Sequence, residues 1–314
     1  LPEMAPKVTH IITRLILGGA QENTLLTCEG LQDSGDWDVE LITGPALGPE
    51  GSLLQRARSG SIRTTVVPDM RREINPWRDT RTFDRLLCVL RKRPPLIVHT
   101  HSSKAGILGR FAAHVARVPH VVHTIHGLPF HPYQNPLSNA VFISAERAAA
   151  RCCDSVICVA DAMARQALEA GVGRPKQYTT VYSGMEVDSF LNADRLRQDA
   201  RRKLGFAPEH FVIGKIARLF ELKGHRYVLE AAPRILERCP QARFLFVGDG
   251  VLREELQRKA RRLGVDDRIV WTGLVDYSRI PEMLSAMDML LHASLREGLP
   301  RVVVDDDVDV RSRG

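Results

Sequence analysis

Short apolar runs alternate with longer stretches of mixed polarity along most of the chain. A strand that is buried on both faces of a parallel sheet reads as a continuous apolar run, whereas a surface helix repeats its apolar residues every three to four positions. The alternation therefore predicts parallel sheets wound with helices. The predicted strands cover residues 8–13, 39–43, 62–67, 96–100, 120–125, 155–159, 178–182, 211–217, 243–247, 268–272 and 289–293.

Helices are predicted between these strands. In the stretch 77–93, Phe83, Leu86, Leu87 and Leu90 fall at a spacing of three and four, which predicts one buried helix face. Another helix is expected to open after the first strand. The remaining predicted helices cover residues 104–115, 138–151, 225–237, 252–263 and 280–286.

The polar, strongly charged segment 188–208 separates two series of predicted strands, and we place a domain boundary there. A chain of 314 residues is long enough for two domains that each bury a core. We expect an α/β fold with one Rossmann-like domain at 1–190 and a second at 205–314. Open parallel sheets bind ligands beyond the carboxyl ends of their strands, so residues that follow strands are the functional candidates.

Composition narrows the class of protein. An apolar content of 44% and a charged content of 26% are typical of a soluble globular protein, and no apolar run reaches the ~18 residues of a membrane span. Residues 4–17 resemble a short signal peptide, but Arg14 interrupts the apolar part, so we interpret them as containing the first strand and expect a cytoplasmic protein. The six cysteines form no CxxC pair, which predicts reduced thiols.

The net charge of +7 is unevenly spread. Between Arg56 and Arg93 there are 11 basic and 4 acidic residues. Such an excess could attract anionic lipid head groups or polyanions, and a solvated basic helix face explains it equally well. No recognition module or aromatic stacking pattern accompanies the charge, which argues against nucleic acid as the partner.

A Gly18-Gly19 pair follows the first predicted strand and opens a helix. Glycines let the backbone approach a ligand closely, and the amino end of a helix favours phosphate. The GxGxxG pattern of dinucleotide-binding enzymes is absent, which argues against a dehydrogenase.

Charged residues and glycines also follow strands in the second half. Arg218 and Lys223 lie across a predicted strand-to-helix turn, and a guanidinium and an ammonium suit a diphosphate whose negative charge grows as a bond to it breaks. Gly248 begins a Gly-Asp-Gly turn after the next strand, and Glu297 follows the last one, where a carboxylate could accept hydrogen bonds from sugar hydroxyls. Each of these features alone also fits ordinary surface charge or turn chemistry.

In this order, the Gly18-Gly19 loop, the Arg218/Lys223 pair, the turn at Gly248 and the run Glu-Gly-Leu-Pro from Glu297 resemble family 4 glycosyltransferases of the GT-B architecture. The resemblance extends over about residues 7–304. It implies two Rossmann-like domains that face each other across a cleft, with the acceptor in the first domain and the nucleotide-sugar donor in the second.

The resemblance also implies roles for particular residues. Arg218 and Lys223 match the pair that holds the donor diphosphate and stabilises the leaving nucleoside diphosphate. Glu297 matches the first acid of a Glu-x7-Glu motif that contacts the transferred sugar. The loop of Gly18 and Gly19 matches the one that approaches the donor phosphate.

Seven of the eleven histidines fall between His99 and His131, and His126 matches a family histidine near the reacting sugar. The cluster suggests a metal site, and His99 and His101 could share one strand face. No HExxH motif, paired carboxylate or nearby cysteine accompanies them, and the resembling enzymes work without a catalytic metal. We therefore expect neither a metal nor another cofactor. The run 102–104 after the fourth strand is a candidate for acceptor or phosphate contact, or a helix cap.

The chain departs from the family pattern near its end. The second acid of the motif falls on Asp305, a shorter carboxylate than the family's glutamate. After it the chain is polar and stops, where the family continues with further strands and helices. From this we expect a truncated chain with an incomplete second domain.

Together these features predict a retaining glycosyltransferase that moves a hexose from a nucleotide-diphosphate sugar to the hydroxyl of a glycan or lipid-linked acceptor. Cell-envelope or exopolysaccharide synthesis is the expected setting, in the cytoplasm and at the inner face of the membrane. Two alternatives stay open. One is an inactive fragment that binds nucleotide sugars or polyanions, and the other is a nucleotide-sugar epimerase, which would act on the donor alone.

Overall fold

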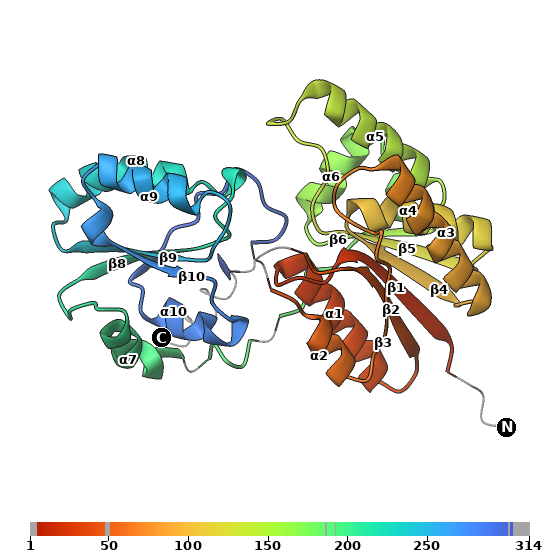
Figure 1. Cartoon of the computed structure of the whole chain (residues 1–314), viewed down its shortest axis with the longest axis horizontal. Coiled ribbons are helices and arrows are strands. Elements are labelled where there is room, and N and C mark those ends of the chain that lie inside the picture. The colour runs from red at the N-terminus through yellow and green to blue at the C-terminus, as the bar shows by residue number, and fades with distance from the viewer. Residues whose placement is uncertain (1–4, 48–50, 186, 192, 301, 304–314) are drawn as a thin grey trace. The chain divides into compact units, whose positions relative to one another are not determined.

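The computed structural model describes residues 5–47, 51–185, 187–191, 193–300 and 302–303. The chain divides into two compact units, Leu1–Met185 (unit 1) and Glu186–Gly314 (unit 2). Each unit contains a parallel β-sheet flanked by helices (Figure 1). The α/β fold with two Rossmann-like units is thus confirmed.

Unit 1 contains a parallel sheet in the strand order β3-β2-β1-β4-β5-β6-β7. The order changes direction between β1 and β4, so the connections after these two strands leave the sheet on opposite sides and open a crevice at its carboxyl edge. The strands are β1 (Lys7–Arg14), β2 (Asp38–Gly44), β3 (Arg63–Val66), β4 (Ile97–His101), β5 (His120–Ile125), β6 (Ser155–Cys158) and β7 (Tyr178–Thr180).

Helices cover both faces of this sheet (Figure 1). Val8 and Ile12 of β1 pack with α1 and α2, whereas Ile11 between them packs with α3 and α4. This alternation buries the strand on both faces, as is typical of a parallel sheet covered by helices. The helices are α1 (Gly19–Asp33), α2 (Leu54–Ser59), α3 (Pro76–Lys92), α4 (Ser103–Ala116), α5 (Pro136–Ala150) and α6 (Asp161–Glu169).

The buried face of α3 is rotated from the predicted one. Leu86 and Leu90 are buried as expected, but Thr82 and Val89 complete the face, and Leu87 is only half-buried. Leu87 therefore lies at the edge of the buried face, because that face is centred on Leu86 and Leu90.

Unit 2 contains a smaller parallel sheet in the order β10-β9-β8-β11. Here the order changes direction between β8 and β11. Figure 1 shows α8 and α9 over one face of this sheet and α7 and α10 over the other, in agreement with the two apolar clusters of the unit. The elements are α7 (Arg197–Lys203), β8 (Phe211–Ile216), α8 (His225–Arg238), β9 (Ala242–Val247), α9 (Arg253–Arg262), β10 (Ile269–Gly273), α10 (Ile280–Ser285) and β11 (Met289–Leu290).

The polar segment at the predicted boundary carries α7, which belongs to unit 2. Arg201 of α7 is buried and lies 3.1 Å from the Asp288 carboxylate, which also pairs with Arg197. The same carboxylate accepts the backbone N–H of Val212 at 2.7 Å. The charged residues of this segment therefore fasten it to the strands β8 and β11 rather than forming a free linker.

The six cysteines are free, as expected for reduced thiols. None of the helices among the described residues combines the length and the apolar composition that a membrane span requires.

Candidate active site

The loops that follow β8 and β11 meet at the point where the strand order of unit 2 changes direction. Gly224, between a 3-10 turn at Glu221–Lys223 and α8, has a positive φ of 73°, and a Cβ there would lie 1.8 Å from the carbonyl oxygen of Ala293. Only glycine permits so close an approach of the two loops. The backbone N–H of Leu295 then donates to the Leu222 carbonyl at 2.9 Å.

This contact places two of the predicted site residues side by side. The Lys223 Nζ lies 2.6 Å from Glu297 Oε1, although 74 residues separate them. The Nε2 of His292 lies 3.3 Å from the same oxygen. Because the Lys223 and Glu297 side chains are 24% and 22% exposed, both remain accessible to a ligand.

Two buried cationic or basic groups beneath this pair were not predicted. Lys215, on β8, is 1% exposed, and its Nζ has no hydrogen-bond partner among the described residues. His225, at the start of α8, is 2% exposed, and neither ring nitrogen has a partner within the same described part of the chain. Buried polar groups without partners are rare in proteins and often mark places where a ligand or water completes the bonding.

The electrostatics of this group is dominated by burial. Burial and the neighbouring Lys223 lower the pKa of Lys215 to about 8, against the opposing effect of Glu297. Burial, with Lys215 and Lys223, lowers the pKa of His225 to about 3. Burial also lowers the pKa of His292, against the effect of Glu297. One carboxylate thus faces two lysines, and the site is short of negative charge, which suits an anionic ligand.

Arg218 lies in the exposed segment that follows β8. Its guanidinium stacks over the Phe220 ring at 5.0 Å from the centroid. Gly248 and Gly250 support this segment from behind, since Cβ atoms there would lie 2.3 and 2.5 Å from the carbonyl oxygens of Ala217 and Leu219. The close approach that these glycines permit is therefore to the Arg218 segment itself, and contact of Gly248 with a donor stays a prediction.

In unit 1, Gly18 caps α1 at the crevice beside β1. Its carbonyl accepts the backbone N–H groups of Gln21 and Glu22 at 3.0 and 2.9 Å, and no side chain caps the helix. The φ of Gly18 is 167°, an extended value, so the backbone conformation does not itself require glycine. The predicted contact of Gly18 and Gly19 with a donor phosphate stays a prediction.

A histidine cluster extends from the core of unit 1 to the same edge of its sheet. His10 on β1 lies opposite His99 on β4 in the parallel register, and His99 and His101 share one strand face, as predicted. His10 was missed because it is 89 residues from His99 and only the adjacency of β1 and β4 joins them. Burial lowers the pKa of His10 and that of His126 to about 4, and it holds the pKa of His101 well below its usual value.

Nitrogen atoms of His10, His99 and His101 all lie within 4.8 Å of one another, a spacing that could hold a metal ion. Neutral imidazoles are metal ligands, but three buried rings supply one ligand fewer than a closed zinc site. The ring nitrogens are also already joined by hydrogen bonds at 3.0 and 3.2 Å, which a metal would have to replace.

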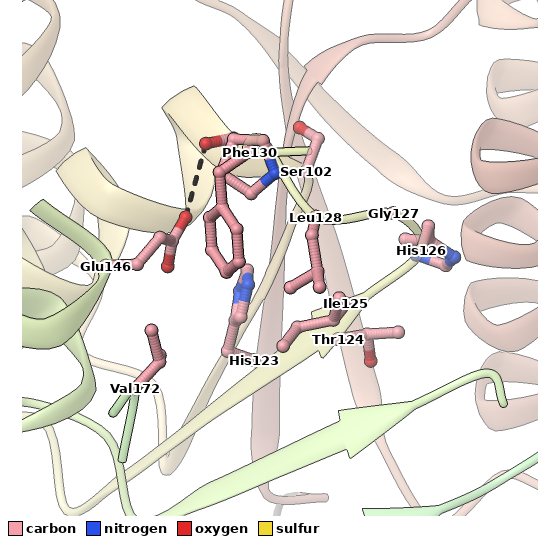
Figure 2. Close-up of a pocket in the computed structure, with 12 residues that line it drawn as sticks. Ser102, His123, Thr124, Ile125, His126, Gly127, Leu128, Phe130, Glu146 and Val172 are labelled. Carbon is pink, nitrogen blue, oxygen red and sulfur yellow. Dashed lines mark hydrogen bonds between the residues drawn. The ribbon is translucent and has the colours of Figure 1, made fainter. Parts of the chain in front are cut away.

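A pocket on the other side of β5 is lined by His123, Phe130 and Glu146 (Figure 2). Glu146 pairs with the buried Arg110 at 2.5 Å and accepts from Ser103 at 3.2 Å. Figure 2 shows the His126 ring turned away from His123 and Phe130. The Glu146 carboxylate is thus already satisfied, and His126 both lines this pocket and bonds to His101 of the histidine cluster.

The run 102–104 is used internally. Ser102 bonds to the Thr13 hydroxyl at 2.7 Å, and Lys104 pairs with Asp79 at 2.7 Å and also donates to the Glu73 carbonyl. Ser102 precedes α4 but makes no side-chain cap bond. The cap hypothesis is therefore wrong for Ser102, whereas contact of this run with an acceptor or a phosphate stays a prediction. Asp305 lies outside the described residues.

Comparison with known proteins accounts for both units. The family model described as "Glycosyl transferase 4-like domain" matches residues 18–184, and the model described as "Glycosyl transferases group 1" matches residues 197–305. The chain belongs to this family of glycosyltransferases. It is therefore an enzyme of glycan biosynthesis that transfers glycosyl groups, as the resemblance implied.

Individual relatives agree with this assignment. The chain is 31% identical over 302 residues to the UDP-Gal:alpha-D-GlcNAc-diphosphoundecaprenol alpha-1,3-galactosyltransferase of Escherichia coli, covering 95% of this chain and 76% of the relative. It is 28% identical over 235 residues to the alpha-D-kanosaminyltransferase of Streptomyces kanamyceticus, covering 70% and 60%. Among solved structures, HepE of Anabaena in complex with UDP and glucose superposes with a TM-score of 0.79 at 20% identity, over 97% of this chain and 78% of HepE. That likeness confirms the GT-B fold.

Proposed function

We propose that this glycosyltransferase moves a hexose from a nucleotide-diphosphate sugar to an acceptor hydroxyl with retention of the anomeric configuration. The observation that carries the proposal is the Lys223–Glu297 pair at 2.6 Å above the buried, unpartnered Lys215. When the bond between the anomeric carbon and the β-phosphate breaks, negative charge grows on the departing diphosphate. Lys223 and Arg218 would stabilise that charge, and Glu297 would hold the sugar hydroxyls.

The relatives favour a uridine nucleotide and a lipid-linked acceptor. The Escherichia coli relative is named for UDP-Gal and a diphosphoundecaprenol-linked acceptor, and the HepE structure contains UDP and glucose. We propose the same donor class and an acceptor carried on a lipid diphosphate. Because lysine and arginine side chains supply the positive charge at the leaving group, we also propose that transfer requires no metal ion.

Calorimetric titration with UDP, GDP and ADP tests the donor site. We expect UDP to bind most tightly without added metal and to bind equally in the presence of EDTA. Arg218→Ala should weaken binding. Arg226 is an exposed arginine on α8, and Arg226→Ala should leave binding unchanged. Absence of binding by a folded sample, or equal loss in both variants, would contradict the assignment of the site.

An assay with UDP-hexose and a lipid-diphosphate acceptor tests the reaction itself. We expect a product whose new glycosidic bond has the anomeric configuration of the donor, as read from its proton coupling constants. An inverted product would exclude the retaining mechanism. Turnover of the donor alone to an isomer would favour the epimerase.

We further propose that unit 1 contacts an anionic membrane surface at the start of α3. Trp77 and Ile74 are 80% and 67% exposed, next to Arg71, Arg72 and Arg78. Exposed aromatic and aliphatic side chains flanked by arginines suit the interface of an anionic bilayer. This patch is narrower than the predicted stretch, because Arg56 and Arg93 pair with acidic residues inside unit 1.

Sedimentation with vesicles of phosphatidylglycerol and phosphatidylcholine tests this surface. Trp77→Ser, or reversal of Arg71, Arg72 and Arg78 to Glu, should release the protein from the anionic vesicles. Leu137→Ser removes a similarly exposed apolar side chain on α5 and should have no effect. Vesicle binding that is unaltered in the Trp77 and arginine variants would rule out this surface.

A further inference from the structure

Three imidazoles form a hydrogen-bonded chain from the core of unit 1 to the carboxyl edge of its sheet. The Nδ1 of His10 lies 3.0 Å from the Nε2 of His101, and the Nδ1 of His101 lies 3.2 Å from the Nε2 of His126. The rings belong to β1, β4 and the loop after β5. His10 is fully buried and His101 is 1% exposed, whereas His126 is partly exposed at the edge.

The three hydrogen-bonded histidines are uncharged at neutral pH. Burial, together with the neighbouring histidines, lowers the pKa of His101, and burial alone lowers the pKa of His10 and His126. Each ring therefore carries one proton, and each of the two hydrogen bonds needs one. His101 must donate one bond and accept the other, so both bonds run in the same direction along the chain.

Two directions are available. If His126 donates to His101 and His101 donates to His10, the proton of His10 is on Nε2. If His10 donates to His101 and His101 donates to His126, the proton of His126 is on Nδ1. In the first case His126 offers a bare Nδ1 acceptor at the edge, and in the second it offers an Nδ1–H donor.

The buried end of the chain decides between the two directions. The Nε2 of His10 is buried and has no hydrogen-bond partner among the described residues. A buried N–H without an acceptor is rarer in proteins than a buried acceptor without a donor. His10 Nε2 is thus better left unprotonated, which places the proton of His10 on Nδ1 and directs both bonds towards His126.

We propose that His10 and His101 are positioning residues that hold His126 in its Nδ1–H tautomer, so that His126 is a fixed hydrogen-bond donor to a hydroxyl or carbonyl oxygen of a bound sugar. The identity of the ligand rests on the proposed function, whereas the tautomer does not. His99 supports the arrangement: it packs 4.2 Å from His101 and 4.9 Å from His10 between ring centroids, and its Nε2 is held by the Thr124 hydroxyl at 2.7 Å.

Nitrogen-15 NMR of the full chain, labelled at histidine, tests the tautomer directly. We expect His10, His101 and His126 each to show a protonated Nδ1 and an unprotonated Nε2 at neutral pH, with resonances assigned from single substitutions. A protonated Nε2 on His126 would overturn the proposal. Hydrogen bonds that run in the opposite direction would instead show a protonated Nε2 on all three rings.

A matched pair of substitutions at His101 tests the consequence for activity. The amide of His101→Asn can donate to His126 Nε2 as the His101 Nδ1 does, whereas the carboxylate of His101→Asp can only accept. We expect the Asn variant to keep the Nδ1–H tautomer of His126 and most of its turnover. The Asp variant should place the proton on Nε2 and lower turnover by about tenfold or more, the factor for one lost hydrogen bond. Equal turnover in the two variants would overturn the proposal.

Titration with Zn²⁺ examines the competing use of the cluster. Binding of one equivalent of zinc at His10, His99 and His101 would show that these rings bind a metal, and it would overturn the proposal. Unchanged histidine resonances on addition of Zn²⁺ would support it. If the tautomers are as proposed but no sugar is transferred, the assignment of the tautomers stands and the proposed function fails. Failure of one proposal can therefore be distinguished from failure of the other.

Discussion

Each sheet gathers its chemically active side chains where its strand order changes direction, between β1 and β4 in unit 1 and between β8 and β11 in unit 2. Both places contain histidines, but they differ in charge and in hydrogen bonding. In unit 1, His10, His101 and His126 bond to one another and are neutral. In unit 2, Lys215 and His225 are buried and have no hydrogen-bond partner within the described part of the unit, beside the Lys223–Glu297 ion pair.

The difference separates two kinds of ligand. A chain of neutral rings that satisfy one another presents a directed donor at its end and suits uncharged oxygen atoms, such as sugar hydroxyls. A group with more positive than negative charge, and with unfilled hydrogen bonds, is stabilised by an anion such as a diphosphate. Under the proposed function, the same topological position would contact the sugar in unit 1 and the diphosphate in unit 2 through different side-chain chemistry.

The largest expected effect is a fall in the free energy of unfolding at acidic pH. A histidine whose folded-state pKa is below that of the unfolded chain stays neutral while the unfolded chain takes up a proton, so its stabilising effect is complete above about pH 6.5 and is lost as the pH falls towards 4. For His10 and His126, each with a pKa of about 4, the loss between pH 7 and about pH 5 is ~2 kcal/mol each, or ~4 kcal/mol for the two, and burial lowers the pKa of His99, His101 and His123 in unit 1 as well. Unit 2 should lose less, mainly through His225.

Urea unfolding followed by tryptophan fluorescence separates the two units. Trp271→Phe leaves the signal of Trp37 and Trp77 in unit 1, and replacing those two by Phe leaves the signal of Trp271 in unit 2. His10→Gln should reduce the pH dependence of unit 1 by about 2 kcal/mol over the same range. Equal pH dependence of the two units would remove the contrast between them.

The strands could be predicted because buried parallel strands are apolar on both faces, and the predicted strands are present within a few residues. The short helices α2, α6 and α7 were not predicted, since each offers too few turns for a clear apolar period. In α7 the buried residues are Ala200 and Arg201, and the charge of Arg201 is satisfied by Asp288, so burial there left little apolar signal in the sequence.

The site was predicted only in part. Arg218, Lys223 and Glu297 were predicted from the order of motifs along the chain, and the structure brings Lys223 and Glu297 together. Lys215 was missed, although its place in an apolar strand, two residues after the inward-facing Ile213, was a usable signal that its charge is buried. The bonds between His10, His101 and His126 could not be predicted, because they depend on the order of strands in the sheet.

The next largest effect is expected at the ion pair of unit 2. Lys223→Ala removes positive charge where the departing diphosphate would lie, and turnover should fall by about a hundredfold. Lys259→Ala removes a lysine of the same unit that pairs with the exposed Glu230 on the helix surface, and it should leave turnover unchanged. Steady-state transfer kinetics measures both variants. Full activity of the Lys223 variant would mean that the charged end of this sheet is structural, and the contrast with unit 1 would lose its functional meaning.

The smallest effect is a pH dependence of donor binding in unit 2. Lys215, with a pKa of about 8, faces Lys223, Glu297, His225 and His292. It is charged at pH 7 and neutral at pH 9, so the affinity for UDP should fall over this interval, by up to about tenfold if one full charge interaction of ~1.4 kcal/mol is lost. Calorimetry at both pH values measures the ratio of dissociation constants.

The control is Lys215→Met, which has a similar volume and no charge, so its ratio of dissociation constants should be closer to one. Titration of the uracil ring itself is common to both proteins and cancels when the ratios are compared. If the two proteins give the same ratio, Lys215 does not sense the diphosphate, and the anion site is limited to the exposed Arg218 and the Lys223–Glu297 pair.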